Sequence, residues 1–241
     1  MGAVRVRHPE GSSKHQENKS ACNEECYPCM ESRLPGVEAW SQDVKAHPPE
    51  VEGIILAAGF SSRAGTCKMA LDIRGKTVLG RCIEAMYDTC SRIIIVGGHK
   101  ASDILNIVLG YPRAELVLNE NYRDGMFSSV RKGLEHVSAG RFFLTPGDYP
   151  LISRDTYESM LNIDGDIIIP AFNGETGHPV LMKHCLVHEL LNAPGCGSLK
   201  DFIDTKGFRR LEVQDEGILE DVDTMQDYNR ICRKFIKTGA V

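Results

Sequence analysis

The sequence predicts an α/β fold in which a mainly parallel, mixed sheet is covered by helices on both faces. Two observations predict it. From Val51 onward, short apolar runs alternate with longer amphipathic stretches, as in βαβ units built around a buried sheet. Before Val51 the chain is polar, and its first fifty residues contain neither Ile nor Phe. We therefore expect one folded domain over residues 51–241, preceded by an N-terminal extension.

Residues 1–50 are predicted to form a flexible, disordered extension, because so polar a segment buries too little apolar surface to offset its ordering entropy. The extension ends at Pro48 and Pro49, because a helix is disfavoured across such a pair. The extension contains Cys22, Cys26 and Cys29, a spacing shared with radical S-adenosylmethionine enzymes. The sequence lacks the barrel that this chemistry requires, so we interpret the three cysteines as a chance pattern or an adventitious metal site.

The elements of the domain follow from the spacing of apolar residues. Runs that are short and largely apolar, as buried strands are, predict strands at Gly53–Ala58, Arg92–Val96, Glu115–Leu118, Phe142–Thr145, Asp166–Ile169, Val180–Met182 and Arg210–Val213. Helical spacing predicts helices at Val78–Cys90, Ser102–Leu109, Ser128–Val137, Asp155–Leu161, Leu186–Leu191, Leu199–Lys206 and Met225–Ile236. No internal repeat is present, which excludes solenoids and propellers.

Composition excludes several classes of partner. The formal net charge of −5 gives no excess of Lys and Arg for binding a polyanion, which argues against a nucleic-acid partner. No apolar run approaches the roughly 18 residues that a membrane helix needs, and the N-terminus has no apolar signal region. Nine cysteines form no recognisable disulfide framework and fit reduced thiols. We expect a cytoplasmic protein without a membrane partner.

The first predicted strand runs into a loop of small residues that carries two cations. Successive main-chain N–H groups in such a loop form an anion-binding concavity, and Gly59 and Gly65 admit backbone angles that other residues resist. Arg63 and Lys68 neutralise phosphate oxygens in this interpretation. The spacing matches neither a Walker loop nor a dinucleotide-binding motif. The alternative is an ordinary surface loop with two solvated cations.

Two acidic segments follow at positions suited to a metal ion. Asp148 comes directly after the predicted strand that ends at Thr145, at the same sheet edge as Gly59, where one or two carboxylates suit Mg²⁺. Asp221 and Asp223 lie on the same side of an extended segment, and either is a candidate second ligand. The alternatives are a plain turn at Asp148 and a helix N-cap at Asp223 or Thr224.

These features, taken in order, resemble the molybdenum cofactor nucleotidyltransferase family, and within it the cytidylyltransferase branch. The resemblance covers about Val51 to Phe235. Its motifs are Leu56-Ala57-Ala58-Gly59 with Ser61, Arg63 and Lys68; Gly125-Met126-Phe127-Ser128-Ser129; Gly147-Asp148-Tyr149-Pro150; Gly177-His178-Pro179; and Asp221-Val222-Asp223-Thr224. The guanylyltransferase branch usually has Leu-Ala-Gly-Gly at the first motif, so Ala58 favours CTP.

The resemblance implies a single Rossmann-like domain and an enzyme that transfers CMP from CTP to the terminal phosphate of molybdenum-molybdopterin, releasing pyrophosphate. It implies Mg²⁺ as cofactor and a molybdenum hydroxylase apoenzyme as a possible partner. The implied catalytic residues are Arg63, Lys68 and Asp148, with Asp148 and Asp223 as metal ligands. The implied nucleotide-binding residues are Leu56, Ala57, Ala58, Gly59, Ser61, Arg63, Lys68, Gly125, Met126 and Ser128; His178, Pro179 and Lys200 are implied to bind the cofactor substrate.

Several alternatives stay open at this stage. His178 is either a cofactor contact or a hairpin-tip histidine, while a buried Met126 and an N-capping Ser128 would explain those residues without a ligand. Family members carry Gly-Asp-x-Gly-Ala-Arg where this chain has residues 195–200, ending in Lys200. Lysine offers a point charge in place of the planar arginine fork. The competing functions are transfer from GTP, transfer to another phosphorylated small molecule, and a non-catalytic carrier of the cofactor.

Overall fold

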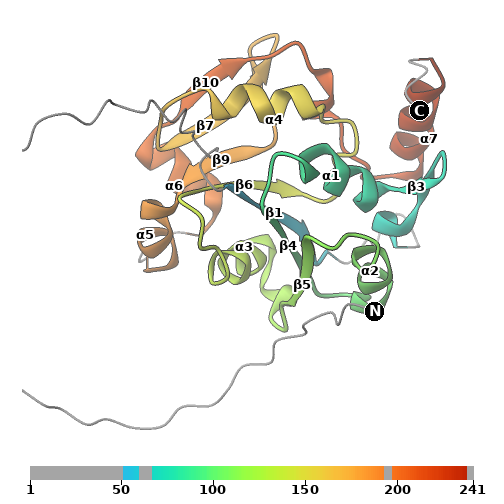
Figure 1. Cartoon of the computed structure of the whole chain (residues 1–241), viewed down its shortest axis with the longest axis horizontal. Coiled ribbons are helices and arrows are strands. Elements are labelled where there is room, and N and C mark those ends of the chain that lie inside the picture. The colour runs from blue at the N-terminus through green and yellow to red at the C-terminus, as the bar shows by residue number, and fades with distance from the viewer. Residues whose placement is uncertain (1–50, 60–66, 193–196, 238–241) are drawn as a thin grey trace, which may run out of the picture. The chain divides into compact units, whose positions relative to one another are not determined.

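A computed structural model of the chain describes residues 51–59, 67–192 and 197–237, with the side chains of residues 236 and 237 left out (Figure 1). The predicted extension and its three cysteines lie outside these ranges. Within them, no helix is long and apolar enough to cross a membrane.

Eight strands form the main sheet and confirm the predicted α/β class. Seven lie side by side in the order β10 (Arg209–Glu212), β7 (Ile167–Phe172), β9 (Val180–Lys183), β6 (Arg141–Pro146), β1 (Val51–Ala57), β4 (Arg92–Gly97) and β5 (Ala114–Leu118), and β8 (Glu175–Thr176) pairs with β7. β9 runs antiparallel to both β6 and β7, whereas β1 is parallel to both of its neighbours. The sheet is therefore mixed and mainly parallel, as predicted.

Helices cover both faces of this sheet (Figure 1). Residues of α1 (Val78–Tyr87), α2 (Ala101–Val108) and α4 (Arg154–Leu161) share one apolar cluster with the sheet, and residues of α3 (Met126–Leu134), α5 (Val187–Asn192) and α6 (Leu199–Lys206) share the other. Within β1, Ile55 belongs to the first cluster and Ile54 to the second, because successive strand residues point to opposite faces. Burial on both faces explains why residues 54–57 of this strand are all apolar.

A small hairpin was not predicted. β2 (Asp72–Ile73) and β3 (Lys76–Thr77) pair across Arg74 and Gly75, whose φ angles are 53° and 82°. The Asp72 carboxylate accepts a hydrogen bond from the Gly75 N–H at 3.0 Å. Ile73 of this hairpin packs with Val222 and with Ile231 of α7 (Met225–Lys237) in a third apolar cluster. The hairpin therefore helps to hold the segment that leads into α7.

A buried carboxylate joins β1 to the segment before β6. Glu52 is 4% exposed and accepts hydrogen bonds from the main-chain N–H groups of Ser138 at 2.7 Å and Ala139 at 3.1 Å. It also pairs with the Arg92 guanidinium at 2.7 Å. Burial acts to raise the pKa of Glu52, but these hydrogen bonds and Arg92 outweigh burial and lower it. The folded protein therefore favours the charged form.

Replacing Glu52 by alanine is expected to lower the free energy of unfolding by about 3 kcal/mol, because two buried N–H groups and Arg92 lose their acceptor. Urea unfolding followed by circular dichroism measures it. Glu115→Ala is the matched control: Glu115 pairs with the same Arg92 at 3.2 Å but is about one-third exposed, so its loss should cost less than about 1 kcal/mol. Equal losses in the two variants would contradict the structural role of Glu52.

The stability that Glu52 contributes depends on pH, and the direction of the change follows from its lowered pKa. Because the folded pKa of Glu52 lies below the ordinary value of 4.5 for a glutamate, the stabilisation is complete above that pH and is lost as pH falls through the folded pKa. Wild-type protein should therefore lose more stability than Glu52→Gln between about pH 5 and pH 3.

Candidate active site

The carboxyl ends of β1 and β6 form one edge of the sheet, and two main-chain hydrogen bonds fix the loops there. The Gly147 N–H donates to the Leu56 carbonyl at 2.9 Å, and the Val222 N–H donates to the Asp148 carbonyl at 2.9 Å. Three segments that are distant in the sequence therefore meet at this edge. After β1 the chain adds β4 and β5 on one side of this strand and then β6 on the other, so the strand order reverses at β1. Open α/β sheets bind ligands at the carboxyl ends of the strands where such a reversal occurs.

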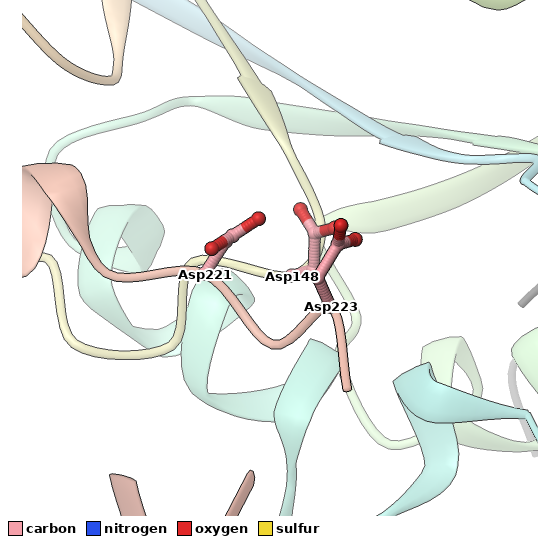
Figure 2. A group of neighbouring side chains, drawn as sticks. All are labelled: Asp148, Asp221 and Asp223. Atoms are coloured by element: carbon pink, nitrogen blue, oxygen red, sulfur yellow. The ribbon is translucent and has the colours of Figure 1, made fainter. Parts of the chain in front are cut away.

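Three carboxylates gather at this edge. Asp148 follows β6, while Asp221 and Asp223 come from the extended segment before α7. One oxygen of each lies within 4.8 Å of the others, and Figure 2 shows the three side chains converging from the two segments. The structure thus brings Asp148 and Asp223 together and adds Asp221, which the sequence left as an alternative to Asp223.

Lys68 lies between two of these carboxylates. It begins a short 3-10 helix, Lys68–Ala70, and its Nζ is 2.5 Å from Asp148 Oδ2 and 3.2 Å from Asp223 Oδ1. Burial acts to lower the pKa of Lys68, but the two carboxylates outweigh burial and raise it. The ammonium group is therefore charged at neutral pH and offsets part of the negative charge of the cluster.

The donor set fits a hard divalent cation. The Oδ1 atom of Asp148 is buried and has no hydrogen-bond partner within the described part of the chain, so an acceptor remains for a ligand. Burial and the charges of Asp148 and Asp223 raise the pKa of Asp221, which shows that negative charge is concentrated here. Carboxylate oxygens are the ligands that Mg²⁺ and Mn²⁺ prefer.

The N-cap of α7 is Thr224 and not Asp223. The Thr224 hydroxyl accepts from the Asp227 N–H at 3.2 Å, and the Asp227 carboxylate accepts from the Thr224 N–H at 2.9 Å. This reciprocal arrangement is a capping box. Thr224 therefore caps the helix, and the Asp223 carboxylate faces Lys68.

A cavity of about 430 Å³ is lined by four of the residues predicted to bind substrates, namely Leu56, Met126, His178 and Lys200. Its lining is mostly apolar and comes from the ends of β1, β6, β7 and β9 and from α3 and α6. Pro179 is buried and is not among the lining residues. The structure thus surrounds one cavity with residues assigned from the sequence to two different substrates.

His178 lies between β8 and β9 and is not at a hairpin tip. That tip is formed by Asn173 and Gly174, which have φ angles of 51° and 86°. The ring of His178 packs edge-on against Tyr149, with centroids 4.7 Å apart, and its Nδ1 is buried without a partner in the described ranges. Burial lowers the pKa of His178 to about 4, although Asp148 opposes the shift. The imidazole is therefore neutral at pH 7.

At the start of α3, the two interpretations without a ligand, a buried Met126 and an N-capping Ser128, are both wrong. Met126 is 67% exposed and does not serve as a buried core residue. Gly125, with a φ of 94°, occupies the N-cap position, so Ser128 is not the cap. The Ser128 hydroxyl instead accepts from Asn119 Nδ2 at 2.9 Å and lies 2.8 Å from the Gly125 carbonyl oxygen. Ser128 therefore stabilises the turn before the helix.

The remaining predicted residues lie at the end of β1 and before α6. Leu56 lines the cavity, Ala57 and Ala58 are buried, and Gly59 is exposed. Ser61, Arg63, Gly195 and Cys196 are outside the described residues. The Ser198 hydroxyl caps α6 by accepting from the Asp201 N–H at 3.1 Å, which places Lys200 in the first turn.

Asp204 and Phe208 are among the residues of the cavity wall that sequence reasoning missed. Lys200 and Asp204 are four residues apart on α6, a spacing that puts both on one helix face, and this spacing was the available signal. Phe208 follows Gly207 at the end of the helix, where the sequence carries no periodic pattern.

Comparisons with known proteins identify relatives of this chain. A model of the MobA-like NTP transferase domain matches residues 53–213. The molybdenum cofactor cytidylyltransferase of Escherichia coli K12 is 28% identical over 179 residues, which cover 74% of this chain and 93% of that protein. A probable molybdenum cofactor guanylyltransferase of Bacillus cereus AH820 is 23% identical over 145 residues, covering 58% of this chain and 72% of the relative.

Solved structures show the same fold. The crystal structure of Rv0371c from Mycobacterium tuberculosis H37Rv has a TM-score of 0.67 and 26% identity, covering 77% of this chain and 99% of that one. A structure titled as the manganese complex of the same mycobacterial protein has a TM-score of 0.64 and 24% identity, with 76% and 98% covered.

Proposed function

Because the chain belongs to the MobA-like NTP transferase domain family and is a nucleotidyltransferase, we propose that it transfers CMP from CTP to molybdenum-molybdopterin. Its relatives are molybdenum cofactor cytidylyl- and guanylyltransferases, so the chain acts in nucleotidyl transfer of molybdenum cofactor biosynthesis. The observation that carries the finer proposal is the position of Lys68 between Asp148 and Asp223, beside a cavity lined by His178 and Lys200.

The reaction brings two anions together. An oxygen of the terminal phosphate of the cofactor forms a bond to the α-phosphorus of CTP, and the bond from that phosphorus to the β-phosphate bridging oxygen breaks. Pyrophosphate leaves with the electron pair. Charge neutralisation and alignment are therefore the main tasks of the protein. In this proposal, Lys68 offsets the charge that develops at the α-phosphate, and Lys200 attracts the phosphate of the second substrate.

Mg²⁺ is the proposed metal, with Asp148 and Asp223 as its ligands and Asp221 as a further carboxylate at the same site. When bound, such an ion neutralises phosphate oxygens and orients them. The buried, unpartnered Asp148 Oδ1 and the manganese complex of the mycobacterial relative support a divalent cation here. The His178 ring, which packs against Tyr149, forms part of the cavity wall. Because it is neutral, it adds no positive charge that would repel the metal ion.

The preference for CTP is supported by Ala58 and by the Escherichia coli relative. Transfer from GTP is the second candidate, because guanylyltransferases also match. A cytoplasmic location and a molybdenum hydroxylase partner remain predictions from the sequence and the resemblance. A carrier without activity is disfavoured, since a pure binder needs neither Lys68 nor the three carboxylates.

Pyrophosphate release tests the proposal. Purified protein with Mg²⁺ is offered CTP, GTP and ATP separately, each with and without molybdenum cofactor. We expect release with CTP plus cofactor, and little with either substrate alone, because both must be aligned for transfer. Release with GTP plus cofactor would replace CTP by GTP as donor. If no combination releases pyrophosphate although the cofactor is intact, the proposed donor and acceptor are both wrong.

A further inference from the structure

We propose that Asp204 is a specificity-determining residue that recognises the pterin ring of the acceptor through both of its carboxylate oxygens. This inference rests on the proposed function, because it assigns the cavity beside the acidic cluster to the acceptor. Three observations carry it: the apolar character of the cavity, the position of Asp204 within it, and the chemistry of the pterin edge.

The walls of the cavity suit a flat, largely apolar ring. Leu56, Leu144 and Val180 line it from the strand ends. Among the described residues, five large apolar side chains are exposed, and two of these, Met126 at 67% and Phe208 at 40%, line this cavity. Exposed apolar groups gathered around one cavity indicate a ligand that covers them. A sugar, with hydroxyl groups on most of its atoms, would leave these walls poorly matched.

Asp204 is the single carboxylate among the residues that line the cavity. It lies one helical turn after Lys200, yet the described structure contains no ion pair between the two side chains. Lys200 is therefore available to an anion and Asp204 to hydrogen-bond donors. A ligand that removes Asp204 from water must replace its hydration with donors, because an unpaired carboxylate in an apolar site is costly.

The pyrimidine edge of a pterin provides those donors. Its 2-amino group and the adjacent ring N–H point in the same direction, so a carboxylate accepts from both, as it does from arginine. The cavity extends from Asp204 to His178, whose ring contacts Tyr149 next to Asp148. An acceptor with its pterin at Asp204 and a phosphate group elsewhere in the same molecule thus finds complementary charge at Asp204 and Lys200.

Fluorescence titration with two small pteridines tests this directly. Pterin carries the 2-amino group, whereas lumazine has a carbonyl oxygen in its place, which would face the Asp204 carboxylate and be repelled. We expect wild-type protein to bind pterin at least about tenfold more tightly than lumazine, as expected when hydrogen bonds to a charged group are lost. Asp204→Asn offers one acceptor and one donor, so the preference should fall to about one.

Two further measurements separate recognition from loss of structure. In the transfer assay, Asp204→Asn should raise the KM for the cofactor about tenfold and leave the KM for CTP unchanged. Asp155→Asn removes the same charge from an exposed position on α4 and should behave as wild type in both assays. If Asp204→Asn fails to fold, equal binding of pterin and lumazine to wild-type protein still overturns the proposal without a variant.

Equal binding of pterin and lumazine to wild-type protein would overturn the role of Asp204. If CMP transfer is nevertheless observed, only this inference fails and the proposed function stands. If pterin is preferred in an Asp204-dependent way but no nucleotide is transferred to the cofactor, the proposed function fails and the pterin site stands.

Discussion

Asp148→Asn is expected to lower the turnover of nucleotidyl transfer by about 1,000-fold, equivalent to about 4 kcal/mol of transition-state stabilisation. Asp148 contributes the buried oxygen that has no partner in the described structure, and it sits at the centre of the contacts with Lys68 and the segment before α7. An amide keeps the size of the side chain but removes the charge that a divalent cation requires.

The fold should survive this substitution. The main-chain carbonyl of residue 148 accepts from the Val222 N–H and is unchanged in the variant, and Lys68 keeps its contact with Asp223. Removing one of three clustered carboxylates also relieves repulsion. Initial rates under saturating CTP and cofactor measure turnover, thermal unfolding verifies the fold, and electron paramagnetic resonance of free Mn²⁺ measures metal binding. Turnover close to that of wild type, with metal binding retained, would remove Asp148 from the metal site.

Lys68→Met is expected to lower turnover by about 100-fold or more, because the Lys68 ammonium group contacts both Asp148 and Asp223 and the variant removes its positive charge from the site of phosphoryl chemistry. The effect on the metal should be opposite to that of the aspartate variant. With the ammonium group removed, the carboxylates attract a divalent cation more strongly, so Mn²⁺ binding should be retained or tightened. A combined loss of turnover and metal binding would assign Lys68 a structural role instead.

The matched control for this variant is Lys76→Met. Lys76 lies on β3, is exposed and pairs with Glu84 at 2.6 Å, so it has the same chemistry outside the site. It should retain wild-type turnover. Lys68→Arg restores the charge with a different shape, and partial recovery of turnover would indicate that charge at this position is the main requirement.

The sequence predicted the framework of the fold because buried strands and amphipathic helices have clear apolar patterns. All seven predicted strands and all seven predicted helices are present, with ends that differ by a few residues. Helix α3 begins at Met126, two residues before the predicted Ser128, since Gly125 provides the turn. The β2–β3 hairpin was not predicted, because its turn has Arg74 at positive φ before Gly75, in place of the Asn-Gly or Asp-Gly pair that signals such turns.

The polar centre of the site was predictable from residue type and position along the chain. Lys68, Asp148 and Asp223 each follow or precede a recognisable element, and parallel strands bring their carboxyl ends to one edge. The cavity wall was not predictable, since Asp204 and Phe208 reach it only through the packing of α6 against the sheet. Nothing in a one-dimensional pattern specifies that packing.

The hydrogen bond from Val222 to Asp148 has a consequence for biosynthesis of the protein. Lys68 is separated by 80 residues from Asp148 and by 155 from Asp223. During translation, the central strands β1, β4, β5 and β6 and the first two charged groups therefore emerge from the ribosome well before the third. A nascent chain can assemble its central strands early, since domains fold from the N-terminal side during synthesis. It acquires a complete charged centre only when the segment around Asp223 docks, so the charged centre is completed after the strands that position it.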